Sequence, residues 1–449
     1  MTNFSIWRVE YSSHGHSSQQ SYLGFALAQS IVLVISTRTS VVPSSIRKRS
    51  RFVVLQEPEI YIMATLVETT PNGFAQPIRG TEGAPIIGPS NHEREAQSPG
   101  RLTPPVTDHG TLPNLKWTFA DSHNKLEEGG WARQTTVREM PVAVELACVN
   151  MRLEAGVVRE MHWHKPAEWG FMIKGNARVT CVDEEGKTYQ ADCTEGDIWN
   201  FPSGIPHSIQ GLSGEGCEFL LVFDDGAFNE EETFLVTDFL AHIPKSVLAK
   251  NFGVQESAFA NIPKSEKYIF RADIPGPLAQ DRVVGAGPTP VIYTHRMGAQ
   301  EPIKSNNGSV RVTDSTNFPA ASTVAAALVE VEPGGMRELH WHRTSDELQY
   351  YLEGQGRMTV YTSNTNAGTF DYQAGDVGYV PCVTPHYVEN TGTTTLRYLE
   401  VWKTERFSDM SLAQWLAFTP YELVRAHLQI EKSVLDRVST TKTPIVGPR

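Results

Sequence analysis

Short runs of apolar residues, either continuous or alternating with polar ones, recur between Gly-rich turns through most of the chain after residue 140. One group lies at residues 171–175, 177–182 and 217–223, and a second lies at 348–352, 357–361 and 396–402. Short, evenly spaced strands bounded by turn residues are typical of an antiparallel sandwich or barrel. The pattern therefore predicts a mainly all-β fold with one barrel for each group.

Apolar residues with the 3.6-residue period of a helix follow each group of strands. These segments are 237–250 after the first group, and 412–417 and 422–428 after the second. Such spacing predicts short amphipathic helices after each barrel. We expect their apolar faces to pack against the other domain or another subunit.

Two parts of the chain repeat each other. The run Gly156-Val-Val-Arg-Glu-Met-His-Trp-His164 returns as Gly334-Gly-Met-Arg-Glu-Leu-His-Trp-His342, and His162 and His340 are 178 residues apart. The stretch from Gly196 to His207 returns from Gly375 to His386 at an offset of 179. This period is far longer than the roughly 20–50 residues of a solenoid repeat, so it indicates a duplicated domain.

The repeat sets the expected domain boundaries. The first barrel with its helices spans 141–255, a linker and the start of the second unit span 256–320, the second barrel with its helices spans 321–435, and a tail follows at 436–449. Residues 63–140 are rich in Pro, Gly, Thr and Asn and lack periodicity. That composition predicts an irregular N-terminal arm.

The first 62 residues differ from the rest, because they carry six basic and three acidic residues around the apolar run 22–36. This run of about 15 residues is shorter than the roughly 20 needed to span a bilayer. Met63 followed by Ala-Thr-Leu-Val-Glu would serve as a start, which makes residues 1–62 a doubtful extension. We therefore expect a cytoplasmic protein, and secretion or membrane anchoring through 22–36 is the alternative.

Charge and cysteine usage exclude some functions. The 449 residues carry a net charge of −12, which argues against nucleic acid as a partner because a phosphate-binding surface needs a basic excess. The five cysteines form no C-x-x-C pair and are too scattered for a disulfide framework or a zinc ribbon. Nothing outside residues 1–62 requires a membrane partner.

The repeated motif has metal-ligand spacing. Alternate residues of a strand share a face, so His162 and His164 point one way and Trp163 the other. Glu168 can reach back from the next strand, and His207 comes from a later one. Three imidazoles and a carboxylate suit manganese, iron or nickel with open positions for a substrate. Since the set occurs twice in register, we predict two metal sites, with the ligands His162, His164, Glu168, His207, His340, His342, Glu347 and His386.

Both copies fit the cupin pattern G-x5-H-x-H-x3,4-E-x6-G, from Gly156 to Gly175 and from Gly334 to Gly354. A second motif, G-x5-P-x-G-x2-H-x3-N, fits less strictly, because Gly211 replaces its Asn in the first copy. With runs such as Arg-Glu-Met-His-Trp-His-Lys-Pro-Ala-Glu-Trp, residues 115–449 resemble the bicupin oxalate decarboxylases of fungi and bacteria. This resemblance implies two manganese ions per chain, dioxygen as a co-catalyst that is not consumed, and a homo-oligomer, either a trimer or a hexamer.

An arginine lies three residues before each H-x-H, Arg159 in the first copy and Arg337 in the second. Strand alternation alone gives Arg159 the opposite parity to His162, which places it outside the pocket unless the strand bends. The resemblance implies the contrary, that these arginines hold the substrate carboxylate. A planar guanidinium suits a dicarboxylate, which it can bind through two parallel hydrogen bonds.

The polar segment 224–234 after the first barrel is, by pattern alone, a solvated acidic turn. The resemblance instead implies a lid over the first site whose glutamate donates a proton. Anchoring on Asp225-Gly and Thr233-Phe234 gives Glu230 this role, with Glu231 and Glu232 as the alternatives. The second unit offers Asp409 in the corresponding stretch, and Glu400 aligns with a carboxylate near the second metal.

The resemblance therefore implies an enzyme that cleaves oxalate to formate and carbon dioxide at the first site. Oxalate oxidase, which makes carbon dioxide and hydrogen peroxide, is the alternative, but it needs no proton delivered to carbon. The glutamates at 230–232 favour decarboxylation. A quercetin-type dioxygenase would gain nothing from an arginine beside the metal, and bicupin storage proteins have lost the ligands that are intact here.

Overall fold

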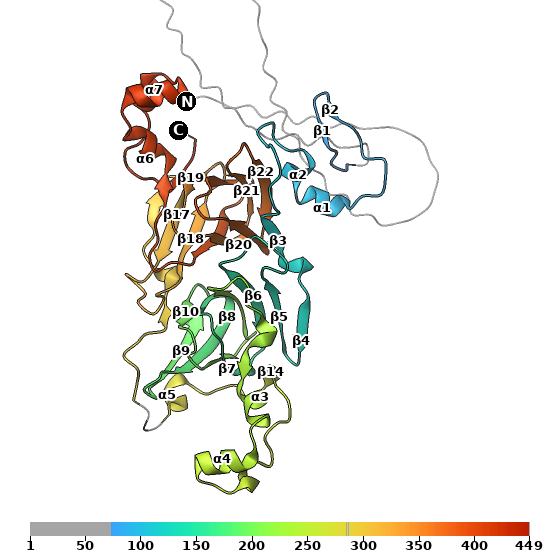
Figure 1. The fold of residues 1–449 in the computed structure, drawn as a ribbon, viewed down its shortest axis with the longest axis vertical. Helices are drawn as coiled ribbons and strands as arrows, with labels where there is room; N and C mark the ends of the chain where they lie inside the picture. Colours follow the sequence, from blue (N-terminus) through green and yellow to red (C-terminus); the bar gives the residue numbers. More distant parts are fainter. Residues whose placement is uncertain (1–72, 284, 286, 449) are drawn as a thin grey trace, which may run out of the picture. The chain divides into compact units, whose positions relative to one another are not determined.

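Antiparallel strands are the main regular secondary structure in the described part of the chain, which comprises residues 73–283, 285 and 287–448 of a computed structural model. The prediction of a mainly all-β fold with two barrel-like units is confirmed (Figure 1). The segment 1–62, with its apolar run 22–36, lies outside the described residues. Within the described ranges, no helix is long and apolar enough to cross a membrane.

One twelve-stranded sheet forms the first unit. Its longest strand is β8 (Glu168–Val182). The first half of β8 pairs with β10 (Ile198–Phe201) and β12 (Cys217–Phe223), and the second half pairs with β9 (Thr188–Thr194) and β11 (His207–Gly211). Gly175 lies between these halves at φ 78°, a conformation that costs glycine no steric strain. The other strands are β4 (Asn124–Glu127), β5 (Gly130–Thr135), β6 (Ala147–Leu153), β7 (Val157–Trp163), β13 (Phe234–Leu235), β14 (Ile269–Arg271) and β15 (Thr294–His295).

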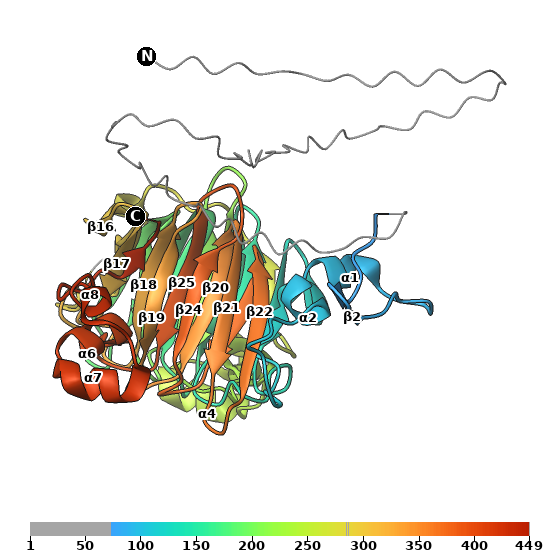
Figure 2. The same ribbon diagram turned by 90° about the horizontal axis from the view of Figure 1, so that it is seen from above.

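The second unit divides the same plan between a seven-stranded and a six-stranded sheet. Gly354, at φ 80°, separates β20 (Glu347–Glu353) from β21 (Gln355–Tyr361), the counterparts of the two halves of β8. Figure 2 shows many of these strands in a row. The remaining strands are β3 (Lys116–Thr118), β16 (Ile303–Ser305), β17 (Gly308–Thr313), β18 (Ala325–Val331), β19 (Met336–Trp341), β22 (Ala367–Gln373), β23 (Asp376–Val380), β24 (His386–Asn390), β25 (Leu396–Trp402), β26 (Met410–Ser411) and β27 (Ile445–Val446).

The expected irregular arm at 63–140 is only partly irregular in the structure. Its described start holds the short elements β1 (Ile78–Arg79), β2 (Glu82–Gly83), α1 (His92–Ala96) and α2 (Pro99–Leu102). Further on, β4 and β5 join the first sheet, and β3 pairs with β23 of the second unit. The partners of β3 lie about 260 residues away, so no local pattern in the sequence marks this pairing.

After each set of helices, a short strand pairs with the edge of a strand that carries candidate ligands. β14 pairs with β7, and β27 pairs with β19. Residues 269–271 of the expected linker and 445–446 of the expected tail thus belong to the two units. The predicted helices are present as α3 (Val236–Ala241) and α4 (Lys245–Phe252) after the first barrel, and as α6 (Leu412–Ala417) and α7 (Tyr421–Leu428) after the second. Two further short helices, α5 (Leu278–Asp281) and α8 (Lys432–Leu435), were not predicted.

Candidate metal centres

The first candidate centre lies inside the first barrel. The structure brings together His162, His164, Glu168 and His207, whose candidate ligand atoms all lie within 4.8 Å of one another. His162 is in β7, Glu168 begins β8 and His207 begins β11, opposite His162. All four side chains are buried, so the residues that strand alternation placed on one face do share the interior.

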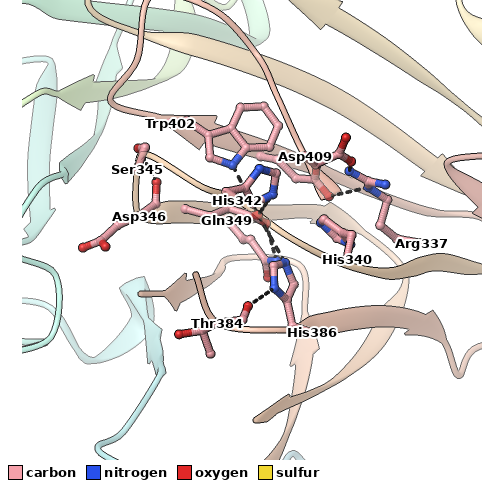
Figure 3. A network of polar contacts seen from close by, with 12 residues as sticks. Arg337, His340, His342, Ser345, Asp346, Gln349, Thr384, His386, Trp402 and Asp409 are labelled. Carbon is pink, nitrogen blue, oxygen red and sulfur yellow. Dashed lines mark hydrogen bonds and ion pairs between the residues drawn. The ribbon is translucent and has the colours of Figure 1, made fainter. Parts of the chain in front are cut away.

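The second centre repeats this arrangement with His340, His342, Glu347 and His386, again within 4.8 Å and buried. Figure 3 shows the three imidazoles converging from β19, the segment after it and β24. His340 lies opposite His386 in the β19–β24 pair. The eight residues with ligand spacing therefore form two clusters.

Every imidazole in the two clusters has its Nδ1 within 2.6–3.0 Å of a backbone carbonyl oxygen. A carbonyl oxygen only accepts, so Nδ1 carries a proton in each ring, and Nε2 is the nitrogen turned toward the cluster, where its lone pair can bind a metal once Nε2 is deprotonated. His340 Nε2 is buried and has no hydrogen-bond partner within the described residues. Backbone contacts of this kind orient histidine ligands in metal sites, so both clusters fit a divalent transition metal.

The ionisation states also suit a metal. Burial, Arg159 and the neighbouring imidazoles hold the pKa of His162 well below its ordinary value, which favours the neutral ligand form. Burial opposes ionisation of Glu168, but His207 and His164 outweigh it and hold the pKa of this carboxyl well below its usual range. The Trp199 indole N–H donates to Glu168 at 2.9 Å and fixes its orientation.

Arg159 points into the first site, contrary to what strict alternation implies. Between His162 and Arg159, the two residues Glu160 and Met161 of β7 lie opposite the single residue Ser208 of β11, which is a β-bulge. The extra residue reverses the parity, so that Arg159 is 1% exposed and its Nε is buried without a hydrogen-bond partner in the described chain. β19 bulges at the same place and buries Arg337.

The segment after the first barrel closes over Arg159. Glu230 forms an ion pair with Arg159 at 2.7 Å, accepts a hydrogen bond from the Tyr268 hydroxyl at 3.2 Å, and is 4% exposed. Its neighbours Glu231 and Glu232 are exposed. The short 3₁₀ helix Glu230–Glu232 begins at Asn229, whose side chain accepts from the Glu231 N–H. This turn directs one glutamate inward and two toward solvent.

The second site holds its arginine differently. Arg337 lies 3.4 Å from Glu400 and 2.6 Å from Asp409, and both carboxylates are buried. Figure 3 shows the contact between Arg337 and Asp409. Asp409 thus takes the place that Glu230 has in the first site, and Lys442 from the C-terminal segment forms an ion pair with it. Burial raises the pKa of Glu400 despite the opposing effect of Arg337.

Sequence patterns did not identify two residues near these arginines. Tyr268 stacks on Arg159, with the guanidinium carbon 4.2 Å from the ring centroid, and its carbonyl accepts from Arg159 at 3.3 Å. Lys442 reaches Asp409 from the tail. Both are brought in by β14 and β27, whose pairing partners are more than 100 residues away, so local sequence carries no signal for them.

Comparison with known proteins decides the family. The sequence profile of the Cupin family matches residues 118–258 and 296–435. The oxalate decarboxylase OxdC of Bacillus subtilis is 55% identical over 376 residues, which cover 84% of this chain and 97% of that protein. This chain belongs to the bicupin oxalate decarboxylase family. A probable oxalate decarboxylase of the fungus Arthroderma benhamiae is 39% identical over 378 residues and covers 83% of the chain.

A solved structure agrees with the membership in the oxalate decarboxylase family. The structure of Bacillus subtilis oxalate decarboxylase in which Mn(II) centres were studied superposes with a TM-score of 0.82 at 54% identity. It covers 84% of this chain, and the whole of that chain is matched. The family resemblance inferred from the duplicated motif is therefore confirmed.

Proposed function

We propose that this chain is a manganese-dependent oxalate decarboxylase, with one manganese ion in each cluster. The observation that carries the proposal is the first site, where a buried three-histidine, one-glutamate cluster adjoins the Arg159–Glu230 pair. When bound, manganese supplies open positions for oxalate and a centre through which an electron can pass, with dioxygen as a co-catalyst that is not consumed.

Oxalate and one proton give formate and carbon dioxide, so a C–C bond breaks and a C–H bond forms. The Arg159 guanidinium binds a substrate carboxylate, and the buried Arg159 Nε, which has no partner in the described chain, can donate a hydrogen bond to that carboxylate. Glu230 delivers the proton to the carbon that becomes formate and takes another from solvent afterwards. With Glu230 4% exposed, the closed segment keeps water away from that carbon.

We assign decarboxylation to the first site. Arg337 is flanked by Glu400 and Asp409, and a dianionic substrate approaching it would meet both carboxylates. Lys442 further holds Asp409 in place. Arg337 and Glu400 therefore have, at most, an assisting role toward oxalate in the second site.

Measuring the products tests the proposal against the oxidase alternative. The manganese-loaded protein should convert each oxalate consumed into about one formate, with hydrogen peroxide as a trace product. Peroxide in amounts that match oxalate consumed would make the protein an oxidase, and no turnover with both sites loaded would overturn the proposal.

We further propose a homo-oligomer, a trimer or hexamer, as the family resemblance implies. Aromatic side chains gather beside both ligand strands, with Phe234 and Phe239 against Trp163, and Trp415 against Trp341. Phe239 and Trp415 are more than half exposed in the single chain, which supports a partner over these faces. Light scattering should give three or six times the 49.8 kDa chain mass, and a monomer would contradict it.

For the compartment, we propose the cytoplasm. Two features support this compartment. The apolar run 22–36 is short for a spanning helix, and Met63, which would serve as a start, directly follows residues 1–62. Mass spectrometry of the native N-terminus tests this. A peptide from within 1–62 would favour secretion or anchoring.

A further inference from the structure

The two candidate metal centres differ in the group that accepts a hydrogen bond from the backbone N–H of the residue before the ligand glutamate. In the first site Ala167 precedes Glu168, and its N–H donates to Asp224 Oδ1 at 2.8 Å. Asp224 directly follows β12 of the same unit. The corresponding position after β25 is Lys403, which offers no acceptor. The second site must therefore find its acceptor elsewhere.

That acceptor comes from the first unit. Asp346 precedes the ligand Glu347, and its N–H donates to Glu145 Oε2 at 2.9 Å. Ser345 lies 3.5 Å from the same carboxylate. The Tyr379 hydroxyl closes the connection, because it donates to Asp346 Oδ2 at 2.8 Å and accepts the Glu145 N–H at 3.1 Å. Ser345, Asp346 and Tyr379 are buried, and Figure 3 shows the first two beside the imidazole cluster.

Hydrogen bonds and burial fix the backbone on either side of Glu145. On either side of it in sequence, Val144 accepts the Gly226 N–H at 3.2 Å and Leu146 is fully buried. Gly226 also accepts from the Val137 N–H at 2.9 Å, so the segment 137–146 is tied to the root of the first lid at two points. A side chain on such a support can fix the direction of what it binds.

We infer that Glu145 of the first unit is a positioning residue for the second metal centre. It holds the Asp346 peptide and thereby aims Glu347 at the cluster, so the second site is complete only when the two units are packed together. Asp224 does the same for Glu168 within the first unit. The inference rests on the proposed metal binding. Residues that orient metal ligands typically change affinity roughly 10- to 100-fold when replaced.

Two backgrounds separate the sites. His162→Ala leaves the second site as the manganese-binding one, and His340→Ala leaves the first. Titrating each full-length protein with Mn(II), and following unbound Mn(II) by its electron paramagnetic resonance signal, gives one dissociation constant per background. In the His162→Ala background, Glu145→Ala should raise this constant roughly tenfold or more. In the His340→Ala background, the same change should leave it within about twofold.

Matched variants serve as controls. Glu145→Gln keeps an acceptor oxygen for the Asp346 N–H and should restore most of the affinity. Asp224→Ala should give the opposite pattern, weakening the first site and sparing the second. An unchanged second site in Glu145→Ala, or equal losses in both backgrounds, would overturn the inference. A parent protein that binds no manganese would instead overturn the proposed function, and this is seen before any Glu145 variant is measured.

Discussion

In each site an arginine forms an ion pair with a carboxylate, but the two sites differ in how easily a substrate can displace that carboxylate. Arg159 faces one carboxylate, Glu230, while Arg337 contacts Glu400 and an Asp409 that Lys442 also holds. A carboxylate in a segment that can move away can yield its place to oxalate and return with a proton. A carboxylate paired from two sides is much harder to displace.

Replacing Glu230 by glutamine tests its role as proton donor. The amide keeps the shape of the side chain but cannot protonate carbon, so formate production should fall roughly 10²-fold, a usual contribution of general acid catalysis. Manganese content should not change, because Glu230 is not among the cluster residues. When carbon is not protonated, dioxygen can oxidise oxalate to two carbon dioxide and is itself reduced to hydrogen peroxide, so the peroxide formed per oxalate consumed should rise.

The neighbours of Glu230 are the controls for this experiment. Glu231→Gln and Glu232→Gln alter exposed side chains of the same turn and should have small effects. Formate at the parent rate from Glu230→Gln, together with a loss in one neighbour, would move the donor to that neighbour. Parent rates from all three would make the second site, with Glu400, the better candidate.

Arg159→Lys tests the substrate contact. An ammonium group can neither form two parallel bonds to a carboxylate nor stack its plane on Tyr268 as the guanidinium does. We expect a higher KM for oxalate and a lower kcat, with kcat/KM reduced about 10²-fold or more. Steady-state kinetics measures both. Values within twofold of the parent would mean that Arg159 does not contact oxalate.

At this scale the sequence predicts the ligands better than the residues around them. Histidines two apart on a strand share a face whatever the rest of the fold does, so the H-x-H spacing alone places His162 and His164 together. The direction of Arg159 depends on a bulge, which alternation does not foresee. The choice of Glu230 within three glutamates came from the resemblance, and its burial is a property of the folded turn.

Among the elements, the lid segment depends on a close backbone approach at its root. A Cβ on Gly226 would collide with the backbone of Ala143 and Val144. Gly226→Ala should displace the segment that carries Glu230 and lower formate production, by up to about 10²-fold where donor geometry is critical. The first site should keep its manganese, because Gly226 is not among the cluster residues. Gly88→Ala is the matched control, since a Cβ there meets nothing within 4 Å. Parent activity in Gly226→Ala would show that the lid tolerates the shift.

Elements with a strong local pattern were predictable, and those fixed by distant partners were not. The helices α3, α4, α6 and α7 follow from their apolar period, and the central strands follow from their alternation. β3, β14 and β27 have only two or three residues each. They are stabilised by pairing with strands far away in sequence, which no window of the sequence displays. Tyr268 and Lys442 enter the sites next to such strands.

For the molecule as a whole, the buried imidazoles link stability to pH. The pKa of His162 in the folded protein lies well below its ordinary value of 6.5, mainly because of burial and Arg159. The unfolded chain therefore binds this proton more readily, and the stability that a neutral His162 provides is lost as pH falls below about 6.5. In the second site, His340 shifts in the same direction. Burial also lowers the pKa of His386, but Glu347 outweighs it and raises that pKa overall, so the two shifts there oppose each other.

The metal-free protein should accordingly unfold at progressively lower urea concentration as the pH is reduced from 7.5 to 5.5. Manganese should raise the midpoint at pH 7.5, and this gain should shrink toward pH 5.5, because metal and protons compete for the same nitrogens. His162→Gln removes one titrating group and should flatten the pH dependence of the metal-free protein, whereas His427→Gln, at an exposed position, should leave it unchanged. A manganese-induced gain that is constant across this range would mean that the ion does not bind through the histidine clusters.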